Sequence, residues 1–525
     1  MNKLRVGFLI DRLKVDYHVE QLIKFVEKDK SFEKPVLITG YANDKHQSFS
    51  QKLVNLFKGP PLKVIDKIFK ALLFRLIRKI ELFQILGVSP NYDRNIDLGN
   101  NSSFEIVSVK GQWSKSGLFI DFTYEDVSHI INSELDCIIR CGSGILRGKI
   151  LDSSKYGVLS FHHGDNRINR GGPSGFWEVL NGDPSTGFII QKLNSELDGG
   201  EVFFRGNITT ADYWTLNNAT LLEKSNIFMK RTLKELATKK KLPIAEDIRL
   251  HGNKLYKINS SKILLKYCIK ILIPKIFFKM ISKILSPKVD RWSVAYALHN
   301  NFSKSLWRYK EIKNPIGRFL ADPFVFQKDA ADYIFVEDFF YSDGKGRISA
   351  IKISDESYKF LGVVLEEDFH LSFPFIFTHE DQVYMIPESS ENKDIRLYKC
   401  EKFPSKWTLE KILMSDVSAA DTMIFFKNNI WFMLTNIDSA NCGDHNSELH
   451  VFYTTNFNSN SWKPINPTNP IIFDSLRSRN GGMFSHKGVT YRVNQIQAKG
   501  RYGKSFAINK IHEISENEFI EEKIS

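Results

Sequence analysis

The sequence predicts an α/β domain with a mostly parallel sheet, followed by an all-β domain built as a five-bladed propeller. Two observations carry this prediction. Over residues 1–240, short apolar runs alternate with segments of helical periodicity, which is typical of a parallel sheet covered by helices. Over residues 291–525, aromatic strand segments recur about every fifty residues, which is typical of propeller blades. The intervening residues 241–290 are predicted to form a basic amphipathic linker.

The first domain opens with a strand–helix–strand unit. The apolar runs 6–10 and 35–39 flank a segment in which Val19, Leu22 and Val26 recur at helical spacing. Further strands and helices complete the domain. The strands are predicted at 104–109, 136–142, 158–162, 188–193 and 201–204. Helices are predicted at 124–132, after a loop within 145–151, and at 216–236, where the last closes the domain.

Residues from about 45 to 102 interrupt this alternation and are predicted to be an insertion. One face of a helix within it carries the apolar residues Ile65, Phe69, Leu72, Leu76 and Ile80. Basic residues fall near the opposite face. A basic amphipathic helix is typical of peripheral contact with an anionic membrane, and equally of a surface helix packed on its own domain. Both interpretations stay open.

A second basic segment lies between the two domains. From Lys262 to Lys288 the chain has seven lysines and no acidic residue, and Pro274 interrupts the segment. It lacks the roughly 18 uncharged residues of a membrane span. An interfacial anchor or a basic linker helix is therefore expected.

Composition indicates the cellular compartment of the protein and the kinds of partner that it binds. The net charge of +13 predicts an acidic partner or surface, such as sugar-nucleotide phosphates or anionic lipid, unless it reflects a generally lysine-rich composition. No nucleic-acid-binding signature is present, so no nucleic-acid partner is expected. The five scattered cysteines do not fit a zinc site, and the N-terminus reads as a first strand, not as a signal peptide. We expect no metal and a cytoplasmic protein, with peripheral contact at the inner face of the membrane left open.

The stretch from Ser160 to Val202 concentrates reactive side chains. It contains two histidines, six acidic residues and a cluster of glycines. His162 ends a predicted strand and precedes a loop rich in Gly, Asn and Arg, which is where open α/β sheets bind ligands. Asp198 follows downstream, before two glycines. A histidine and an aspartate brought together by the fold are suited to acid–base chemistry.

An ordered series of short motifs runs through this stretch. The series is Ser160-Phe161-His162, Arg170-Gly171, Trp177, Asn181-Gly182, Thr186-Gly187 and Leu197-Asp198-Gly199-Gly200. It resembles the folate-dependent formyltransferases, which include methionyl-tRNA, glycinamide ribonucleotide and sugar N-formyltransferases. The resemblance covers roughly residues 1–240. It implies a Rossmann-like domain that uses 10-formyltetrahydrofolate as the formyl donor.

The resemblance also implies roles for individual residues. His162, Asp198 and Ser160 are the expected catalytic groups, although Ser160 stands where the family has Asn. The upstream Gly144-Ile145-Leu146 and Ile150-Leu151-Asp152 look like the family's cofactor-side strand–helix unit. The residues expected to bind the cofactor are Gly142, Ile145, Leu146 and Leu197.

The loop after His162 departs from the family pattern. Asp165, Asn166 and Arg167 replace an apolar loop, and they are expected either to bind a phosphate or sugar hydroxyl of the acceptor or to form a solvated turn. Arg170 is expected to brace this loop on the acceptor side. His163 is expected to be structural, because strand side chains alternate in direction.

The second domain contains four visible repeats. Their equivalent positions are Pro323, Pro374, Thr422 and Gly482, and each is followed by a turn and a second aromatic strand. The segments 292–296 and 506–511 are expected to pair and supply a fifth blade. Asp322, Glu388 and Asp421 occupy similar places in successive repeats. Acids at such places hydrolyse glycosides, bind sugar hydroxyls or cap turns, and we favour binding or structure.

This half resembles the glycosidase-like five-bladed propeller at the N-terminus of plant glucosamine inositolphosphorylceramide transferases. The matching motifs are Ala321-Asp322-Pro323-Phe324, Pro387-Glu388-Ser389, Phe403-Pro404-Ser405-Lys406-Trp407, Ala420-Asp421-Thr422 and Tyr502-Gly503. The resemblance implies a glycan at the propeller.

Together the two resemblances predict a formyltransferase that modifies the amine of an amino sugar, carried as a sugar nucleotide, in surface polysaccharide biosynthesis. Three alternatives stay open. They are a related hydrolase or acyl transferase, a glycan-binding protein on a degenerate formyltransferase fold, and a propeller that itself acts on glycans.

Overall fold

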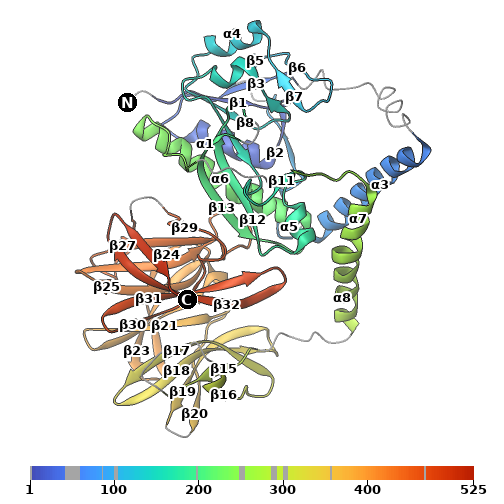
Figure 1. Ribbon diagram of the computed structural model, residues 1–525. Coiled ribbons are helices and arrows are strands. Elements are labelled where there is room, and N and C mark those ends of the chain that lie inside the picture. Colours follow the sequence, from blue (N-terminus) through green and yellow to red (C-terminus); the bar gives the residue numbers. More distant parts are fainter. Residues whose placement is uncertain are drawn as a thin grey trace. The chain divides into compact units, whose positions relative to one another are not determined.

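A computed structural model describes most of the chain (Figure 1). The described residues are 3–41, 60–85, 87–99, 104–196, 199–247, 255–284, 292–298, 306–354, 357–465 and 469–525. Contacts divide the chain into two compact units, Met1–Ile281 and Ser282–Ser525. Most of the segment expected as a linker, up to Ile281, falls in the first unit.

The first unit contains a seven-stranded sheet in the order β13-β12-β10-β8-β1-β3-β5. Its strands are β1 (Val6–Leu9), β3 (Val36–Thr39), β5 (Glu105–Ser108), β8 (Cys137–Arg140), β10 (Val158–His162), β12 (Ser185–Lys192) and β13 (Glu201–Thr209). The five strands from β10 to β5 are parallel, and β12 and β13 are antiparallel. Every residue of β1 and β3 is buried, as expected for central parallel strands. The sheet is therefore mixed, with the predicted parallel part at its centre.

Helices accompany this sheet. They are α1 (Tyr17–Lys28), α4 (Tyr124–Asn132), α5 (Phe176–Asn181) and α6 (Trp214–Lys239). The prediction of a helix after Gly144 is wrong, because a short strand and a 3-10 turn occupy this segment. β9 (Ile145–Leu146) pairs with β7 (Phe119–Asp121), which itself pairs with β6 (Gln112–Trp113), and a 3-10 turn at Gly148–Asp152 follows. Because β9 uses its backbone groups in this ladder, only one short turn remains.

In the described part of the predicted insertion lie a long helix, α3 (Pro61–Ile85), and a short strand, β4 (Asn95–Asp97), which pairs with β2 (Lys14–Asp16). The second basic segment forms α7 (Ser261–Tyr267), a π-helical turn and α8 (Ile273–Ile284). Just before it, β14 (Leu255–Tyr256) pairs with β11 (Arg170–Gly171).

A buried tyrosine joins these helices. The Tyr267 hydroxyl donates to Glu81 Oε1 at 2.5 Å and accepts from the Trp214 backbone nitrogen at 2.9 Å. It therefore links α3, α7 and α6. Among the described residues, no helix is both long and apolar enough to cross a membrane.

The second unit is all-β. Its four larger sheets are antiparallel: β17–β20, β21–β24, β25–β28 with β29 added, and β30–β33. The first two strands of each are β17 (Arg318–Lys328) and β18 (Ala331–Phe340), β21 (Ser372–His379) and β22 (Gln382–Ser389), β25 (Ala419–Lys427) and β26 (Ile430–Ile437), and β30 (Asn480–His486) and β31 (Val489–Ala498). The remaining strands are β19 (Lys345–Ile353), β20 (Tyr358–Leu365), β23 (Asp394–Lys402), β24 (Lys406–Ser415), β27 (Glu448–Thr454), β28 (Lys463–Pro464), β29 (Ile472–Phe473), β32 (Arg501–Ile514) and β33 (Phe519–Lys523).

The expected pairing of residues 292–296 with 506–511 is wrong. β15 (Val294–Tyr296) pairs with β16 (Lys310–Ile312), while β32 already pairs with β31 on one edge and β33 on the other. A strand with both edges paired cannot accept a third partner. The five-blade count stays a prediction.

The first strand of each large sheet carries a β-bulge at the same place. The register shifts after Ala321, Ser372, Ala420 and Asn480. In the first three sheets the next residue has a positive φ, and in the fourth Gly482 has one. A bulge bends its strand and re-aims a side chain, so the repeat places one redirected side chain in each sheet.

Candidate functional site

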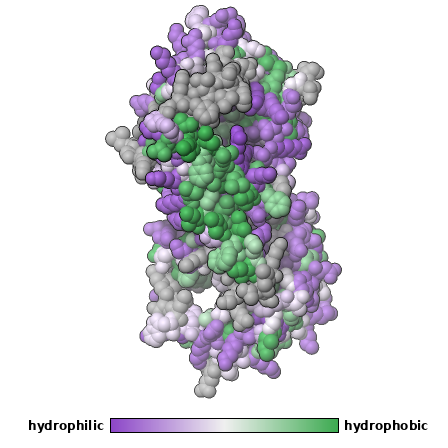
Figure 2. Space-filling view, turned by 90° about the vertical axis from the view of Figure 1, so that its right-hand side faces the viewer, coloured by the Kyte–Doolittle hydropathy of each residue, from purple (hydrophilic) through white to green (hydrophobic). Residues whose placement is uncertain are grey.

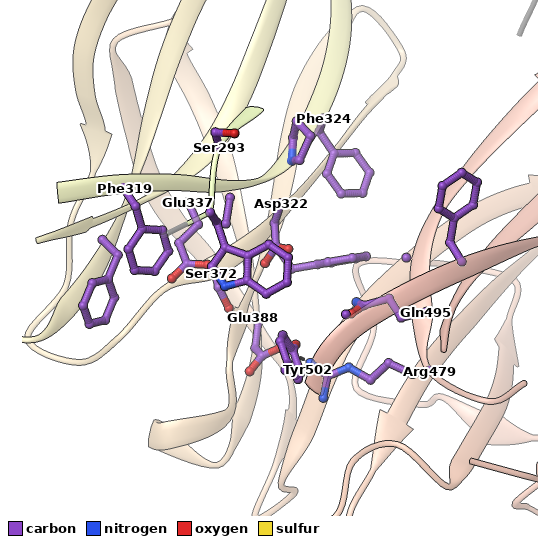
Figure 3. Close-up of a pocket in the computed structure, with 18 of the residues that line it drawn as sticks. Ser293, Phe319, Asp322, Phe324, Glu337, Ser372, Glu388, Arg479, Gln495 and Tyr502 are labelled. Carbon is purple, nitrogen blue, oxygen red and sulfur yellow. Dashed lines mark ion pairs between the residues drawn. The ribbon is translucent and has the colours of Figure 1, made fainter. Parts of the chain in front are cut away.

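The second unit contains a cavity of about 840 Å³. Its polar lining includes Asp322, Glu337, Glu388, Arg479 and Gln495, and Figure 3 shows these side chains around one space. Asp322 and Glu388 were expected from the repeats, together with Asp421, which lies fully buried behind Arg479. The cavity thus collects acids from different repeats.

The acids come from two equivalent positions in each sheet. Asp322 and Asp421 stand at the bulges of β17 and β25, with φ of 46° and 50°. The expectation that Glu388 occupies the same place is wrong, because Phe373 stands at the bulge of its sheet. Glu388 and its equivalent Glu337 lie on the second strands, opposite the residue before each bulge. The other two sheets have asparagine at this second position, Asn436 and Asn494. Non-glycine residues rarely adopt positive φ, and those that do cluster at functional sites.

Arg479 neutralises one of these acids. Its Nε and Nη2 donate to the two carboxylate oxygens of Asp421, the second at 3.3 Å, and Nη2 lies 3.8 Å from Glu388 Oε2. Burial opposes the charge of Arg479, yet the adjacent Asp421 keeps its pKa above the usual range. The guanidinium is therefore a permanent cation beneath the cavity.

Asp322 and Glu337 form a proton-holding pair. Burial, with the nearby charge of Glu388, raises the pKa of Asp322 to about 6, and a side-chain hydrogen bond joins it to Glu337. Burial and the charge of Asp322 raise the pKa of Glu337 well above its usual range. Glu337 is therefore protonated and donates a hydrogen bond to Asp322.

Glu388 behaves in the opposite way. Although burial favours its neutral form, Arg479 and a hydrogen bond from Ser390 Oγ at 2.7 Å lower the pKa of Glu388. The cavity therefore presents an ionised carboxylate beside a protonated one. This combination is suited to hold a cation or to hydrogen-bond sugar hydroxyls.

His370 fixes one side of Glu337. Its Nδ1 accepts from the Gly346 nitrogen at 3.0 Å, so Nε2 carries the proton in the neutral ring and lies 3.4 Å from Glu337 Oε1. Burial lowers the pKa of His370, which keeps the ring neutral.

Aromatic rings form the apolar walls. Phe319 stacks on Phe339 with ring centroids 4.8 Å apart, and Tyr502 packs edge-to-face on Trp292 at 6.0 Å. The ring of Tyr502 also lies 5.8 Å from the Arg479 guanidinium. Apolar walls with a few convergent polar groups are typical of small-molecule sites.

In the first unit, the predicted catalytic residues lie at the carboxyl ends of parallel strands. Ser160 and His162 are on β10, and Arg140 ends the neighbouring β8. Arg140 Nη1 donates to Ser160 Oγ at 3.5 Å, and Ser160 Oγ donates to the Phe161 carbonyl at 3.0 Å. Arg140 also donates to the Gly144 carbonyl, and its buried Nε has no hydrogen-bond partner among the residues that the structure describes. Asp198 and Leu197 lie outside the described residues.

His163, the residue after β10, lines a cavity of about 190 Å³ together with Arg140 and Gly142. Its Nε2 lies 3.1 Å from Ser225 Oγ, and its ring stacks on Phe161. Burial lowers the pKa of His163 to about 3.

The described cofactor-side residues have internal packing partners. The Tyr41 hydroxyl donates to Asp11 Oδ1 at 2.7 Å, and a Cβ placed on Gly142 would lie 1.7 Å from that hydroxyl. Leu146 is buried in the core, whereas Ile145 is half-buried. Position 142 therefore accommodates only glycine, because any Cβ would overlap the Tyr41 hydroxyl.

The loop expected to bind the acceptor is held by a network of ion pairs. Arg205 on β13 contacts Asp165 and donates to Asn166 Oδ1 at 3.0 Å. Glu246 accepts from Arg205 at 3.1 Å and from Arg167 at 2.8 Å. These three loop residues therefore brace one another through Arg205 and Glu246. Arg170 lies on β11, paired with Leu255 of β14, and its role as a brace of the loop stays a prediction.

Repeat comparison in the sequence missed Arg479, Glu337 and Tyr502. The sequence did contain a signal for Arg479. The equivalent residues in the other sheets are Leu320, Leu371 and Ala419, all buried and apolar, so an arginine there breaks the repeat. Glu337 was detectable as the equivalent of Glu388, whereas Tyr502 lies outside the repeated positions.

Comparisons with known proteins separate the two halves. Residues 305–525 match the family model for glucosamine inositolphosphorylceramide transferase 1, N-terminal. The enzyme of that name from Oryza sativa subsp. japonica is 34% identical over 213 residues, which are 39% of this chain and 27% of that protein. Its counterpart from Arabidopsis thaliana is 34% identical over 212 residues, with the same shares. The chain therefore spans about a quarter of the length of these plant relatives.

A second group of relatives is more distant. Methionyl-tRNA formyltransferase of Lactobacillus johnsonii is 30% identical over 116 residues, which are 22% of this chain and 36% of that protein. The chain is thus similar over residues 305–525 to the N-terminal region of glucosamine inositolphosphorylceramide transferase 1, and weakly similar to methionyl-tRNA formyltransferase.

Proposed function

We propose that the first unit transfers a formyl group from 10-formyltetrahydrofolate to the amine of an amino sugar, carried as a sugar nucleotide, in surface polysaccharide biosynthesis. The observation that carries the proposal is the position of Ser160, His162 and Arg140 at adjacent carboxyl ends of parallel strands. Ligands of open α/β sheets bind at this edge. The similarity to methionyl-tRNA formyltransferase supports the reaction class.

The side chains at this edge suit an acyl transfer. Among the described residues the buried Nε of Arg140 has no hydrogen-bond partner, and protonated His162 supplies a further donor for a carbonyl oxygen. Ser160 supplies another when its hydroxyl turns from the Phe161 carbonyl, to which it donates at 3.0 Å. As the acceptor nitrogen attacks the formyl carbon, these donors stabilise the developing oxyanion. The new nitrogen–formyl bond forms as the bond to the folate nitrogen breaks. We expect Asp198 to keep His162 charged and to help remove the amine proton.

The test is formyl transfer by the purified full chain. The chain is incubated with 10-formyltetrahydrofolate and a panel of amino-sugar nucleotides, and formylated product is followed by mass spectrometry. His162→Ala should lower the rate at least a hundredfold. The matched control is His129→Ala, an exposed histidine on α4. No binding of reduced folate, or full activity of His162→Ala, would overturn the proposal.

A second proposal concerns the cavity of the second unit. We infer that it binds a saccharide carrying a protonated amine. Three carboxyl groups line it, whereas its buried cation, Arg479, is engaged by Asp421 and its other cation, Lys504, is exposed. The aromatic walls suit the apolar faces of a sugar ring. The similarity of residues 305–525 to a sugar-transferase region supports a carbohydrate ligand.

Binding fits this cavity better than hydrolysis. Glycoside hydrolysis needs one carboxylic acid and one free carboxylate on either side of the bond. Asp421 is held by Arg479 and by Gln495 at 3.3 Å. The ionised Glu388 accepts from Ser390 at 2.7 Å and lies 3.8 Å from Arg479 Nη2, so neither carboxylate is free to act.

Calorimetry without any folate tests this second proposal independently of formyl transfer. Methyl glucosaminide should bind at least tenfold more tightly than its N-acetylated form or the neutral methyl glucoside. Glu388→Gln should remove this preference, while Glu516→Gln, an exposed acid on the same unit, should leave it unchanged. Equal affinity for the three sugars would contradict the inference.

A further inference from the structure

Helix α3 leaves a long apolar stripe exposed. The stripe consists of Leu62, Ile65, Phe69, Leu72, Leu76 and Phe83, whose side chains are 43% to 81% exposed. Their spacing of three, four or seven residues places them on one side of the helix. The helix packs into its unit through a different face, which includes Val64, Leu73 and Ile77. The exposed stripe therefore does not face the hydrophobic core of the unit.

The segment α7–α8 repeats the pattern. Its exposed apolar residues are Ile269, Ile273, Phe277, Phe278 and Met280, at 57% to 67% exposure. Its buried side chains, among them Leu264, Tyr267 and Ile271, join the same core cluster as α3. Two neighbouring helices therefore share a core and each present apolar side chains outward.

The two helices run side by side in the same direction. Ser261 donates from its backbone nitrogen to Asp66 at 3.0 Å, Tyr267 contacts Glu81, and Lys279 donates to Gln84 at 2.6 Å. These contacts join the two helical segments at three places, which follow in the same order along both. Figure 2 faces the side of the first unit on which they lie and shows a continuous apolar band there. Exposed apolar patches of this size usually mark an interaction surface.

Charge identifies the partner. Residues 61–85 and 261–284 carry twelve basic and two acidic residues, a net +10 of the chain's +13. Neither acid is a free surface charge, because Asp66 accepts hydrogen bonds from Ser261 and Glu81 is buried against Tyr267. An apolar band flanked by lysines and arginines complements the surface of an anionic bilayer, where long basic side chains reach the headgroups.

We propose that α3 and α7–α8 form a docking surface for an anionic phospholipid bilayer. The two apolar stripes enter the boundary between headgroups and acyl chains, and the basic residues beside them contact lipid phosphates. This surface is separate from the site at Ser160 and His162 and from the cavity of the second unit. The proposal therefore does not depend on either reaction.

Vesicle flotation of the full chain tests the surface. Binding should be at least tenfold stronger to vesicles of phosphatidylcholine with phosphatidylglycerol than to phosphatidylcholine alone, and should weaken as salt is added. The double variant Phe69→Ser and Phe277→Ser should lose at least tenfold in binding. Both side chains are exposed, so circular dichroism should show unchanged folding. The matched control is Val325→Ser and Phe426→Ser, which removes two exposed apolar side chains from the other unit.

A charge variant tests the second half of the proposal. Arg75→Gln, Lys79→Gln and Lys266→Gln, all at exposed positions, should together remove the preference for anionic lipid. Equal binding to both kinds of vesicle by the natural chain would overturn the proposal, as would unchanged binding of the double serine variant. A dimer in solution that the serine variant dissociates, without vesicle binding, would also overturn it and assign the face to a second copy of the chain.

Discussion

Asp322 and Asp421 occupy the same bulge position in two sheets, with φ of 46° and 50°, yet only Asp421 is held by an arginine. The difference divides the acids of the cavity into two kinds. Asp421 forms a buried ion pair with Arg479, whose side chain lines the cavity. Asp322 lines the cavity itself and is hydrogen-bonded to Glu337. The repeat therefore supplies one structural carboxylate and one that can meet a ligand.

Arg479→Gln should destabilise the second unit strongly. Breaking a buried ion pair leaves an uncompensated charge, which typically costs about 3–5 kcal/mol of unfolding free energy. Urea unfolding of the second unit measures this loss. Asp421→Asn together with Arg479→Gln should lose less than Arg479→Gln alone, because neither charge is then left without a partner. Arg477→Gln, two residues away and half-exposed, is the control; a similar loss there would contradict the assignment.

Asp322→Asn should stabilise the protein at neutral pH and weaken sugar binding. The pKa of Asp322 is about 6 in the folded protein and about 4 when unfolded. The folded state therefore loses stability as the pH rises from about 4 to about 6, since it must release a proton that it binds tightly. The variant lacks this cost, so its gain in melting temperature should be largest above pH 6 and smallest near pH 4. A gain that is independent of pH would argue against a raised pKa.

His163→Ala should reduce the acid sensitivity of the protein. The pKa of His163 is lowered by burial to about 3, from about 6.5 in the unfolded chain. Its contribution to stability is therefore complete above pH 6.5 and is lost as the pH falls toward 3. The variant should be less stable at pH 7 by about 0.5–1.5 kcal/mol, because Ser225 loses its hydrogen bond to the ring and keeps only the one to the Leu222 carbonyl. Its stability should fall less steeply in acid, and NMR titration should show the ring of His163 neutral at pH 5.

Gly142→Ala should destabilise the first unit, and Tyr41→Phe should restore part of the loss. The new methyl group would lie 1.7 Å from the Tyr41 hydroxyl oxygen and 3.1 Å from the ring carbon that carries it. Removing the hydroxyl therefore relieves the closest contact. Thermal unfolding of the two single variants and the double variant measures this coupling. Additive losses would show that position 142 does not meet Tyr41.

Sequence periodicity predicted most of the second unit. The repeat that aligns Pro323, Pro374 and Thr422 also aligns the bulges, so Asp322 and Asp421 could be placed in advance. It could not predict that Arg479 pairs with Asp421, because these residues lie in different repeats and meet only when the sheets pack. It also misplaced β15 and β32, since an aromatic strand pattern does not specify its partner.

In the first unit, apolar runs located the strands, and the end of β10 located His162. The contacts of the loop at Asp165–Arg167 were not predictable, because they depend on Arg205 and Glu246, which are far apart in the sequence. The same limit applies to α3. Its amphipathic pattern was clear, but which side faces the core is decided by α7, nearly two hundred residues later.

The two basic helices concentrate the charge of the whole molecule. Apart from residues 61–85 and 261–284, the chain carries a net charge of only +3. Because the positive charge is concentrated on these two helical segments, the field of a negatively charged surface attracts them most strongly and orients the protein before contact is made. Its orientation on arrival is then selected by long-range attraction, and short-range packing only completes an encounter that has already been aligned.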